Sequence, residues 1–223
     1  MNFSRSAKIK AVIIVFSVFF IGLGIALLRL SLLGVDPGSC FSFSVSEHFG
    51  FSFGVVVTTV NLLLFIPAIL FYRGSIGFGT IVDMFGVGFA ADFWRYILTT
   101  MNPKFFSETL QYDFTWQLIV LIAGILILGF FAAFYMAADM GLLPYDAIPF
   151  IIQRFTKWKF RWARVAWDSS FLIGGFLISM LDGTTFEIVG IGTLFLAMGL
   201  GPILNFVMDN IARPTIASLT RGR

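Results

Sequence analysis

The stretch LGVDP at residues 33–37 returns 107 residues later as MGLLP at residues 140–144. Each copy follows a long apolar run, precedes a shorter segment and ends in a proline, which is favoured in the first turn of a helix. Each motif interrupts the apolar pattern, and we call this interruption a break. A break at the same place in two parts of the chain indicates two related halves. We assign residues 1–112 to the first repeat and residues 113–223 to the second, within one integral membrane domain.

Further landmarks recur in the same order around these breaks. They pair Ile21-Gly22 with Leu128-Gly129, Asn61 with Asp168, GFGT at 77–80 with GIGT at 190–193, GVG at 86–88 with GLG at 199–201, and Asp92 with Asn205. The spacing is 107 residues up to Asn61 and 113 from GFGT onward, so six residues are added in the second copy near Asp182-Gly183. Many transport proteins build a central site between two such repeats.

Composition defines the class of protein. Hydrophobic residues make up 58% of the chain and charged residues 12%, whereas a soluble domain carries roughly a quarter charged residues. A soluble domain of this length could not bury so much apolar surface, so the chain is predicted to be an integral membrane protein. Its small positive charge is typical of cytoplasmic loops and does not indicate nucleic-acid binding. The lone Cys40 excludes an internal disulfide and thiolate metal clusters.

Six segments are long and apolar enough to cross a bilayer as helices. They are Ala11–Leu33, Gly54–Tyr72, Ile76–Ile97, Trp116–Met136, Val165–Leu181 and Ile188–Met208. The first follows basic residues, as in a signal peptide, but it is long enough to span and no small-residue cleavage site follows it. We therefore expect it to be a retained transmembrane helix.

Two shorter segments, Gly38–Phe51 and Tyr145–Thr156, follow the prolines. A helix of this length covers roughly 20 Å of a hydrocarbon core of about 30 Å, so each is expected to lie in the interface or to re-enter. In the first, phenylalanine or valine alternates with serine from Phe41 to Ser46, a period of two that is not helical.

If the short segments do not span, each half crosses three times and the second half is inverted. The positive-inside rule then places both termini and the basic residues 157–164 in the cytoplasm, and Arg29 and Glu187 outside. A model with eight crossings and a parallel repeat fits the charges equally well. Segment length favours the first fold: an all-α polytopic protein of six transmembrane helices, as two inverted three-helix repeats that each carry a short interfacial or re-entrant helix.

Together these motifs are similar to those of the YczE/YyaS/YitT group of bacterial membrane proteins. The motifs are GLG at 22–24, LGVDP at 33–37, GFGT at 77–80, GVG at 86–88 and the downstream Asp92, and the resemblance covers most of the chain. The second half departs from the pattern at Phe131, Met140 and Asn205. The resemblance implies a protein of the bacterial cytoplasmic membrane whose activity is poorly defined.

Polar residues inside the predicted membrane helices are the candidate site. Asp83 lies near the middle of the third helix, one turn after Thr80 and on the face of Gly79 and Gly86, and its repeat counterpart is Leu196. A charge there costs about 2.5–3.5 kcal/mol on insertion scales, so it usually faces a cavity or a partner. Asp83 is either a protonatable or cation-coordinating carboxylate or a neutral group in an interhelical hydrogen bond.

Two symmetric pairs, Asn61 with Asp168 and Asp92 with Asn205, exchange an amide for a carboxylate. They either line a shared site or clamp helices through hydrogen bonds of about 0.6 kcal/mol each. The proline breaks add Asp36, Pro37, Pro144 and Asp146. Capping and the helix dipole explain the two aspartates, unless the breaks lie deep enough to contact substrate.

The remaining motifs carry little chemistry. The glycine clusters lie inside spanning helices and indicate close helix packing rather than a phosphate site. His48, next to Glu47, has no second histidine or cysteine at ligand spacing, so no metal site and no cofactor are expected. The tryptophans Trp116, Trp158 and Trp162 are predicted interfacial anchors.

Two functions remain open. The first is a small-solute transporter or permease component with its site at the repeat interface, lined by Asp83, Thr80, Asn61, Asp168, Asp92 and Asn205. The second is a non-transporting scaffold or regulator that binds another membrane or envelope protein. An enzyme is not expected, because no nucleophile with a neighbouring base is visible. The expected partners are the lipid bilayer and a small molecule or ion, with a homodimer open.

Overall fold

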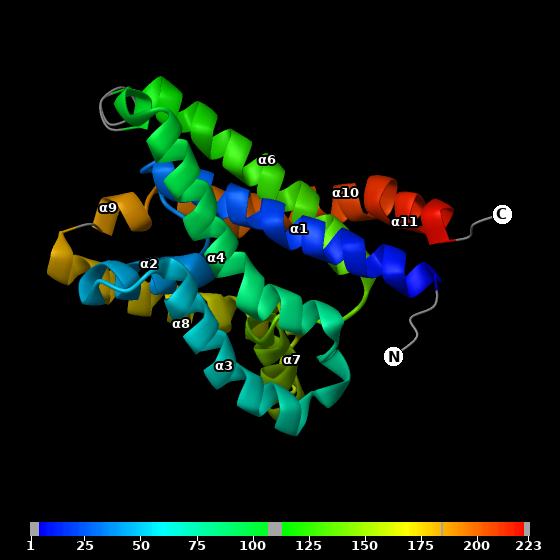
Figure 1. The fold of residues 1–223 in the computed structure, drawn as a ribbon. Helices are drawn as coiled ribbons and strands as arrows, with labels where there is room; N and C mark the ends of the chain where they lie inside the picture. Colours follow the sequence, from blue (N-terminus) through cyan, green and yellow to red (C-terminus); the bar gives the residue numbers. More distant parts are fainter. Residues whose placement is uncertain (1–4, 107–112, 184, 221–223) are drawn as a thin grey trace.

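The computed structural model describes residues 5–106, 113–183 and 185–220, and the regular structure in these ranges is helical (Figure 1). The longer helices are α1 (Arg5–Leu30), α3 (Phe53–Phe71), α4 (Phe78–Met101), α6 (Phe114–Ala138), α8 (Phe160–Asp182) and α10 (Ile191–Val207). The shorter ones are α2 (Pro37–Phe49), α7 (Pro144–Thr156), α9 (Thr185–Ile188) and α11 (Arg213–Thr220), with a 3-10 turn at Arg73–Ser75 and a π-helical turn at Met208–Ala212. The predicted all-α class is confirmed.

Among the described residues, four helices are long and apolar enough to cross a membrane: α1, α3, α6 and α8. The two other predicted crossings correspond to α4 and α10. Helix α4 is 24 residues long but carries Asp83, Asp92 and Arg95, whereas α10 is apolar but only 17 residues long. Length and composition in the structure therefore support a membrane protein, with these four helices as candidate spans.

The helices pack in two groups. In the first group, α1 packs against α4 and α6, and α6 packs against α10. In the second group, α2 packs on α8 and α7 packs on α3. Helix α3 also packs against α4 and so joins the two groups. Figure 1 shows α1 and α6 side by side and running in opposite directions. Each group contains helices from both halves of the sequence, so neither half forms its own core.

Glycines permit the closest helix crossings. A Cβ atom on Gly22 would lie 2.5 Å from the Ala90 Cβ atom in α4, and one on Gly24 would lie 2.8 Å from the Leu128 backbone nitrogen in α6. Neither position leaves room for a side chain. The packing role predicted for the glycine clusters is confirmed at these two positions.

The two short helices cover only part of their long partners. Helix α2 packs along the C-terminal half of α8, where the rings of Phe41 and Phe171 are 5.2 Å apart and the His48 Nδ1 atom lies 3.1 Å from Asp182. Helix α7 packs near the end of α3, where the rings of Phe155 and Phe71 are 5.2 Å apart. Both short helices start at buried or partly buried residues and end at exposed ones, so they begin inside the protein and run outward to its surface.

The alternating segment of α2 is helical despite its period of two. Serine normally competes with helix formation, but here the Ser42 hydroxyl donates to the Gly38 carbonyl oxygen and the Ser44 hydroxyl to the Cys40 carbonyl oxygen within the helix. The serines thus satisfy their own hydrogen bonds and can be buried. At the end of α2, Glu47 accepts a 2.9 Å hydrogen bond from Arg29 Nε, which connects α2 to the last turn of α1.

Candidate functional site

A charged cluster lies where α7 meets α8, and Arg164 is at its centre. The Arg164 Nη1 atom donates a 2.6 Å hydrogen bond to Asp146 in the first turn of α7, and its Nε atom donates a 2.9 Å bond to Asp168 one turn further along α8. The Tyr145 hydroxyl donates a 2.7 Å bond to the other oxygen of Asp168. We call Tyr145, Asp146, Arg164 and Asp168 the Arg164 cluster.

The first turns of the two short helices meet beside this cluster. A Cβ atom on Gly38 of α2 would lie 3.3 Å from the Tyr145 ring, so the two N-termini are in contact through a glycine and a tyrosine. Asp36 caps α2 by accepting a 3.0 Å hydrogen bond from the Ser39 backbone nitrogen, which confirms its predicted capping role. Burial raises the pKa of the Asp36 carboxyl group, hydrogen bonds from Ser39 oppose this shift, and the nearby Asp168 charge adds to it.

The break in each half is held by the glycine motif of the other half. The Val35 backbone nitrogen donates to the Ile188 carbonyl oxygen at 3.1 Å, and the Gly192 nitrogen donates to the Leu33 carbonyl oxygen at 2.7 Å. Gly34 has a φ of 106°, and a Cβ atom there would lie 2.5 Å from the Gly190 backbone nitrogen. Only glycine fits this position on both counts.

The second break makes the same contacts with the first half. The Leu142 nitrogen donates to the Ser75 carbonyl oxygen at 2.8 Å, and the Gly79 nitrogen donates to the Met140 carbonyl oxygen at 2.8 Å. Gly141 has a φ of 121°, and a Cβ atom there would lie 2.4 Å from the Thr80 hydroxyl oxygen. These donors and acceptors correspond to those of the first break through the sequence spacings of 107 and 113.

Asp83 lies inside the protein and next to Tyr135 of α6. Its exposed fraction is 6%, and the Tyr135 hydroxyl and Asp146 of the Arg164 cluster are the polar groups near its carboxyl group. The Tyr135 hydroxyl also lies 3.2 Å from the Gly141 carbonyl oxygen, to which it donates. Asp83 therefore lies near a tyrosine that is bonded to the break before α7.

The other predicted site residues have separate positions. Thr80 is buried and caps α4, since its hydroxyl accepts from the Gly77 nitrogen and donates to the Ser75 carbonyl oxygen. Asp92 accepts a 2.7 Å bond from the Gly54 nitrogen and so clamps α4 to the start of α3. Asn205 is exposed on α10.

Asn61 and Asp168, which correspond in the repeat, have different surroundings. Asn61 is 4% exposed, its amide nitrogen donates to the Val57 carbonyl oxygen of its own helix, and its Oδ1 atom has no hydrogen-bond partner among the described residues. Asp168 is only partly buried and has two partners. The structure thus brings Asp36, Pro37, Pro144, Asp146 and Asp168 to one region, with Asp83 linked to it.

Sequence reasoning did not identify Arg164, Tyr145 or Tyr135 as site residues. In the sequence, Arg164 is only one of several predicted cytoplasmic basic residues. Its position four residues before Asp168 was the available signal, because oppositely charged residues at this spacing meet on one helix face. The tyrosines gave no such signal, since their partners come from other helices.

Two other features bear on ligands. Among the residues that the structure describes, no group of three histidine, cysteine or acidic side chains could hold a metal ion. Two surface hollows are described, and no residue of the Arg164 cluster lines either of them. One lies over α1 and α4 (Ala11, Val12, Val15, Phe16, Phe19 and Phe78) and the other at the start of α8.

Apolar helices of spanning length around a polar interior define a multi-pass membrane protein of helical type. The chain belongs to the family of unknown function DUF6198, whose model matches residues 8–209. It is 26% identical over 194 residues to the "Uncharacterized membrane protein YczE" of Bacillus subtilis, covering 84% of this chain and 82% of that protein. The predicted resemblance to the YczE and YyaS proteins is thereby confirmed.

Two further relatives are similar over most of their length. An "Uncharacterized protein" of Haemophilus influenzae is 25% identical over 213 residues, covering 93% of this chain and 88% of the relative. The "Uncharacterized protein YyaS" of Bacillus subtilis is 25% identical over 206 residues, covering 92% of this chain and 95% of the relative. No solved structure matches the chain.

Proposed function

We propose that this protein is a small-solute transporter of the bacterial cytoplasmic membrane, with its site where the first turns of α2 and α7 meet. The observation that carries the proposal is the Arg164 cluster beside these two helix N-termini. Charged side chains inside a membrane domain are expensive and usually mark a pathway or a ligand. Short helices that begin in the interior are a common way to build transporter sites.

The proposed topology has six crossings, made by α1, α3, α4, α6, α8 and α10, while α2 and α7 re-enter. Three crossings in each half invert the second half and place both termini in the cytoplasm. Two observations support this arrangement. Helices α1 and α6 run in opposite directions (Figure 1), and the hydrogen bonds of the two breaks correspond through the repeat spacing.

The positions of the breaks suggest how access alternates. Residues 33–35 are bonded to the start of α10, and residues 140–142 to the start of α4, so both breaks belong with the α1/α4/α6/α10 group. The hinges then fall just beyond them, at Asp36-Pro37 and Leu143-Pro144. Rocking of the α2/α3/α7/α8 group about these hinges opens the site to one side of the membrane and then to the other.

Proton coupling is assigned to Asp83 in this proposal. Asp83 and Tyr135 lie in the first helix group, whereas Asp146 lies in the second, and the two carboxylates interact. Movement of one group against the other changes the distance between these negative charges. The free energy of charging Asp83 changes with it, which couples proton binding to the direction in which the site is open.

The test uses the full chain in vesicles that contain a trapped pH-sensitive dye. Amino acids, carboxylates, organic cations and sugars are added outside in turn, and we expect one class to cause proton movement. Arg164→Gln should abolish the signal, whereas the control Arg213→Gln, which breaks an exposed pair with Asp209, should leave it intact. Folded protein that responds to none of these solutes would support the scaffold function instead.

A further inference from the structure

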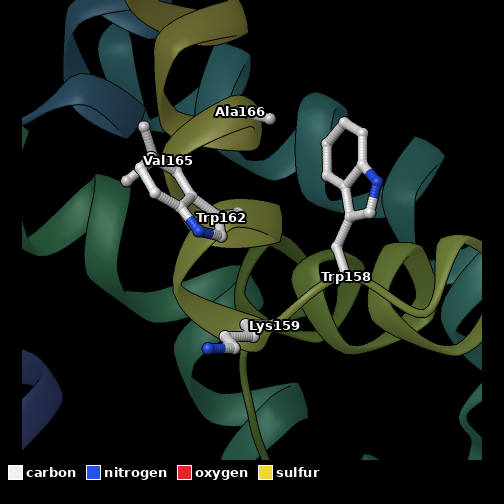
Figure 2. Close-up of a pocket in the computed structure, with 5 residues that line it drawn as sticks. All are labelled: Trp158, Lys159, Trp162, Val165 and Ala166. Atoms are coloured by element: carbon white, nitrogen blue, oxygen red, sulfur yellow. The ribbon is translucent and has the colours of Figure 1, made fainter.

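A surface hollow of about 590 Å³ lies where the loop after α7 enters α8. Figure 2 shows its lining, with Trp158 on one side, Trp162 and Val165 on the other, Lys159 at one end and Ala166 at the other. The hollow therefore has apolar walls and a basic residue at the end where α8 begins.

The walls of this hollow are exposed at the start of a helix that can span a membrane. Trp158 is 51% exposed and Trp162 is 54% exposed, so about half of each side chain has no protein contact. Helix α8 is one of the helices long and apolar enough to cross a membrane. Tryptophan is enriched where such helices leave the hydrocarbon, because its ring is apolar and its N–H group is polar. In a membrane, the apolar part of the hollow would therefore be open to lipid.

The basic residues around the hollow are free to bind an anion. Among the described residues, Lys157, Lys159 and Arg161 take part in no ion pair, and the Arg161 guanidinium lies 5.1 Å from the centre of the Trp162 ring. The next arginine, Arg164, is already paired with Asp146 and Asp168. Three unpaired positive charges next to an apolar hollow are complementary to a molecule with an anionic head and an apolar chain.

We propose that this hollow binds an anionic phospholipid from the surrounding bilayer, of the phosphatidylglycerol type. Its phosphate lies against Lys159 with Lys157 and Arg161 nearby, and its upper acyl chain lies between the two indole rings. The hollow extends from Lys159 to Ala166, about 10 Å along a helix, which is enough to reach from the headgroup layer into the hydrocarbon. The inference does not depend on the proposed transport function.

The experiment measures contact between the tryptophans and brominated lipid. The full chain is placed in phosphatidylcholine vesicles with a small, fixed fraction of dibrominated phosphatidylglycerol or dibrominated phosphatidylcholine, and quenching of tryptophan fluorescence is recorded. We expect brominated phosphatidylglycerol to quench more strongly. In the variant Lys157→Gln/Lys159→Gln, the affinity of the hollow for phosphatidylglycerol should fall about fivefold for each lysine removed, so the difference in quenching between the two lipids should disappear.

Matched controls separate this site from general attraction to the surface. Lys8→Gln/Lys10→Gln removes two basic residues at the other predicted cytoplasmic end and should keep the full preference, and thermal unfolding checks that each variant is folded. Equal quenching by the two lipids would overturn the proposal. A full preference for phosphatidylglycerol in the Lys157/Lys159 variant would also overturn it. Loss of the preference on adding water-soluble glycerophosphoglycerol would overturn it as well, because that result would indicate a site for the phosphate group alone.

Discussion

The Tyr145 hydroxyl and the Asp168 carboxylate are joined by a 2.7 Å hydrogen bond that ties the first turn of α7 to α8. In the other half the corresponding positions are Gly38 and Asn61, and neither can form this bond with the other because glycine has no side chain. The Arg164 cluster is therefore built from residues of the second half alone. The two halves therefore share the backbone hydrogen bonds of their breaks, but they do not share the charged side chains of the Arg164 cluster.

The first prediction concerns Arg164. Replacing it by glutamine in Arg164→Gln leaves Asp146 and Asp168 without their cation, and the unpaired carboxylates repel each other. The pair is half-buried, so we expect a loss of about 2 kcal/mol in unfolding free energy, between the values for exposed and buried ion pairs. Thermal unfolding in detergent measures it.

The control for this prediction is Arg213→Gln. Arg213 also pairs with an aspartate four residues away, but both side chains are more than half exposed. Such pairs contribute between about 0 and 1 kcal/mol. Equal losses in the two variants would mean that the Arg164 cluster contributes no more than a surface pair.

The second prediction concerns the breaks. Gly34→Ala and Gly141→Ala each place a methyl group against backbone or hydroxyl atoms of the opposite half, at positions with positive φ. The backbone strain alone costs about 1–2 kcal/mol, and the clash adds to it, so both variants should yield little folded protein. The amount of monodisperse protein after purification measures this.

Gly74→Ala is the matched control for these glycines. A Cβ atom on Gly74 would meet nothing within 4 Å, and its φ is not in the left-handed region. This variant should fold as well as the wild type. If Gly34→Ala or Gly141→Ala accumulates like Gly74→Ala, the breaks are not fixed by contact with the other half.

Sequence alone predicted much of the backbone and little of the site. The prolines and apolar runs gave α2 and α7 nearly correct bounds, because helix starts and hydrophobic length are local properties. Asp36 was correctly interpreted as a cap for the same reason. The partners of Asp168 were not predicted, because Tyr145 reaches it only through the packing of α7 on α8. Asn205 was grouped with the site by its repeat position, yet it lies exposed on α10.

The third prediction concerns topology. In a Cys40→Ser background, a cysteine at Asn102 should react with a membrane-impermeant maleimide in intact cells, and a cysteine at Gly74 should react only after the membrane is opened. Both residues are exposed at helix ends, so access depends on the side of the membrane. The wild-type Cys40 is 0% exposed and should not react in folded protein.

Reversed labelling in this experiment would contradict the six-crossing arrangement. Protection of the cysteine at Asn102 together with labelling at Gly74 fits eight crossings and a parallel repeat. That result would place α2 and α7 across the membrane and remove the proposed hinges at Pro37 and Pro144.

The last prediction concerns Asp83. Asp83→Asn should abolish solute-driven proton movement in vesicles while leaving the folded protein abundant. Asparagine keeps the size of the side chain and can still hydrogen-bond to Tyr135, but it cannot bind or release a proton. A charge at a helix centre in hydrocarbon costs about 2.5–3.5 kcal/mol, so removing it should not destabilise the fold. The unfolding temperature of the variant should equal or exceed that of the wild type.

Asp92→Asn is the control that separates coupling from structure. Asp92 accepts from the Gly54 nitrogen at the start of α3, so its replacement should lower the unfolding temperature but leave proton movement per folded molecule intact. Tyr135→Phe should instead reduce proton movement per folded molecule, because it removes the hydroxyl that lies near Asp83 and donates to the Gly141 carbonyl oxygen. Full transport by Asp83→Asn would make Asp83 a packing residue. Unfolding of Asp83→Asn would instead indicate a structural role and favour the scaffold function.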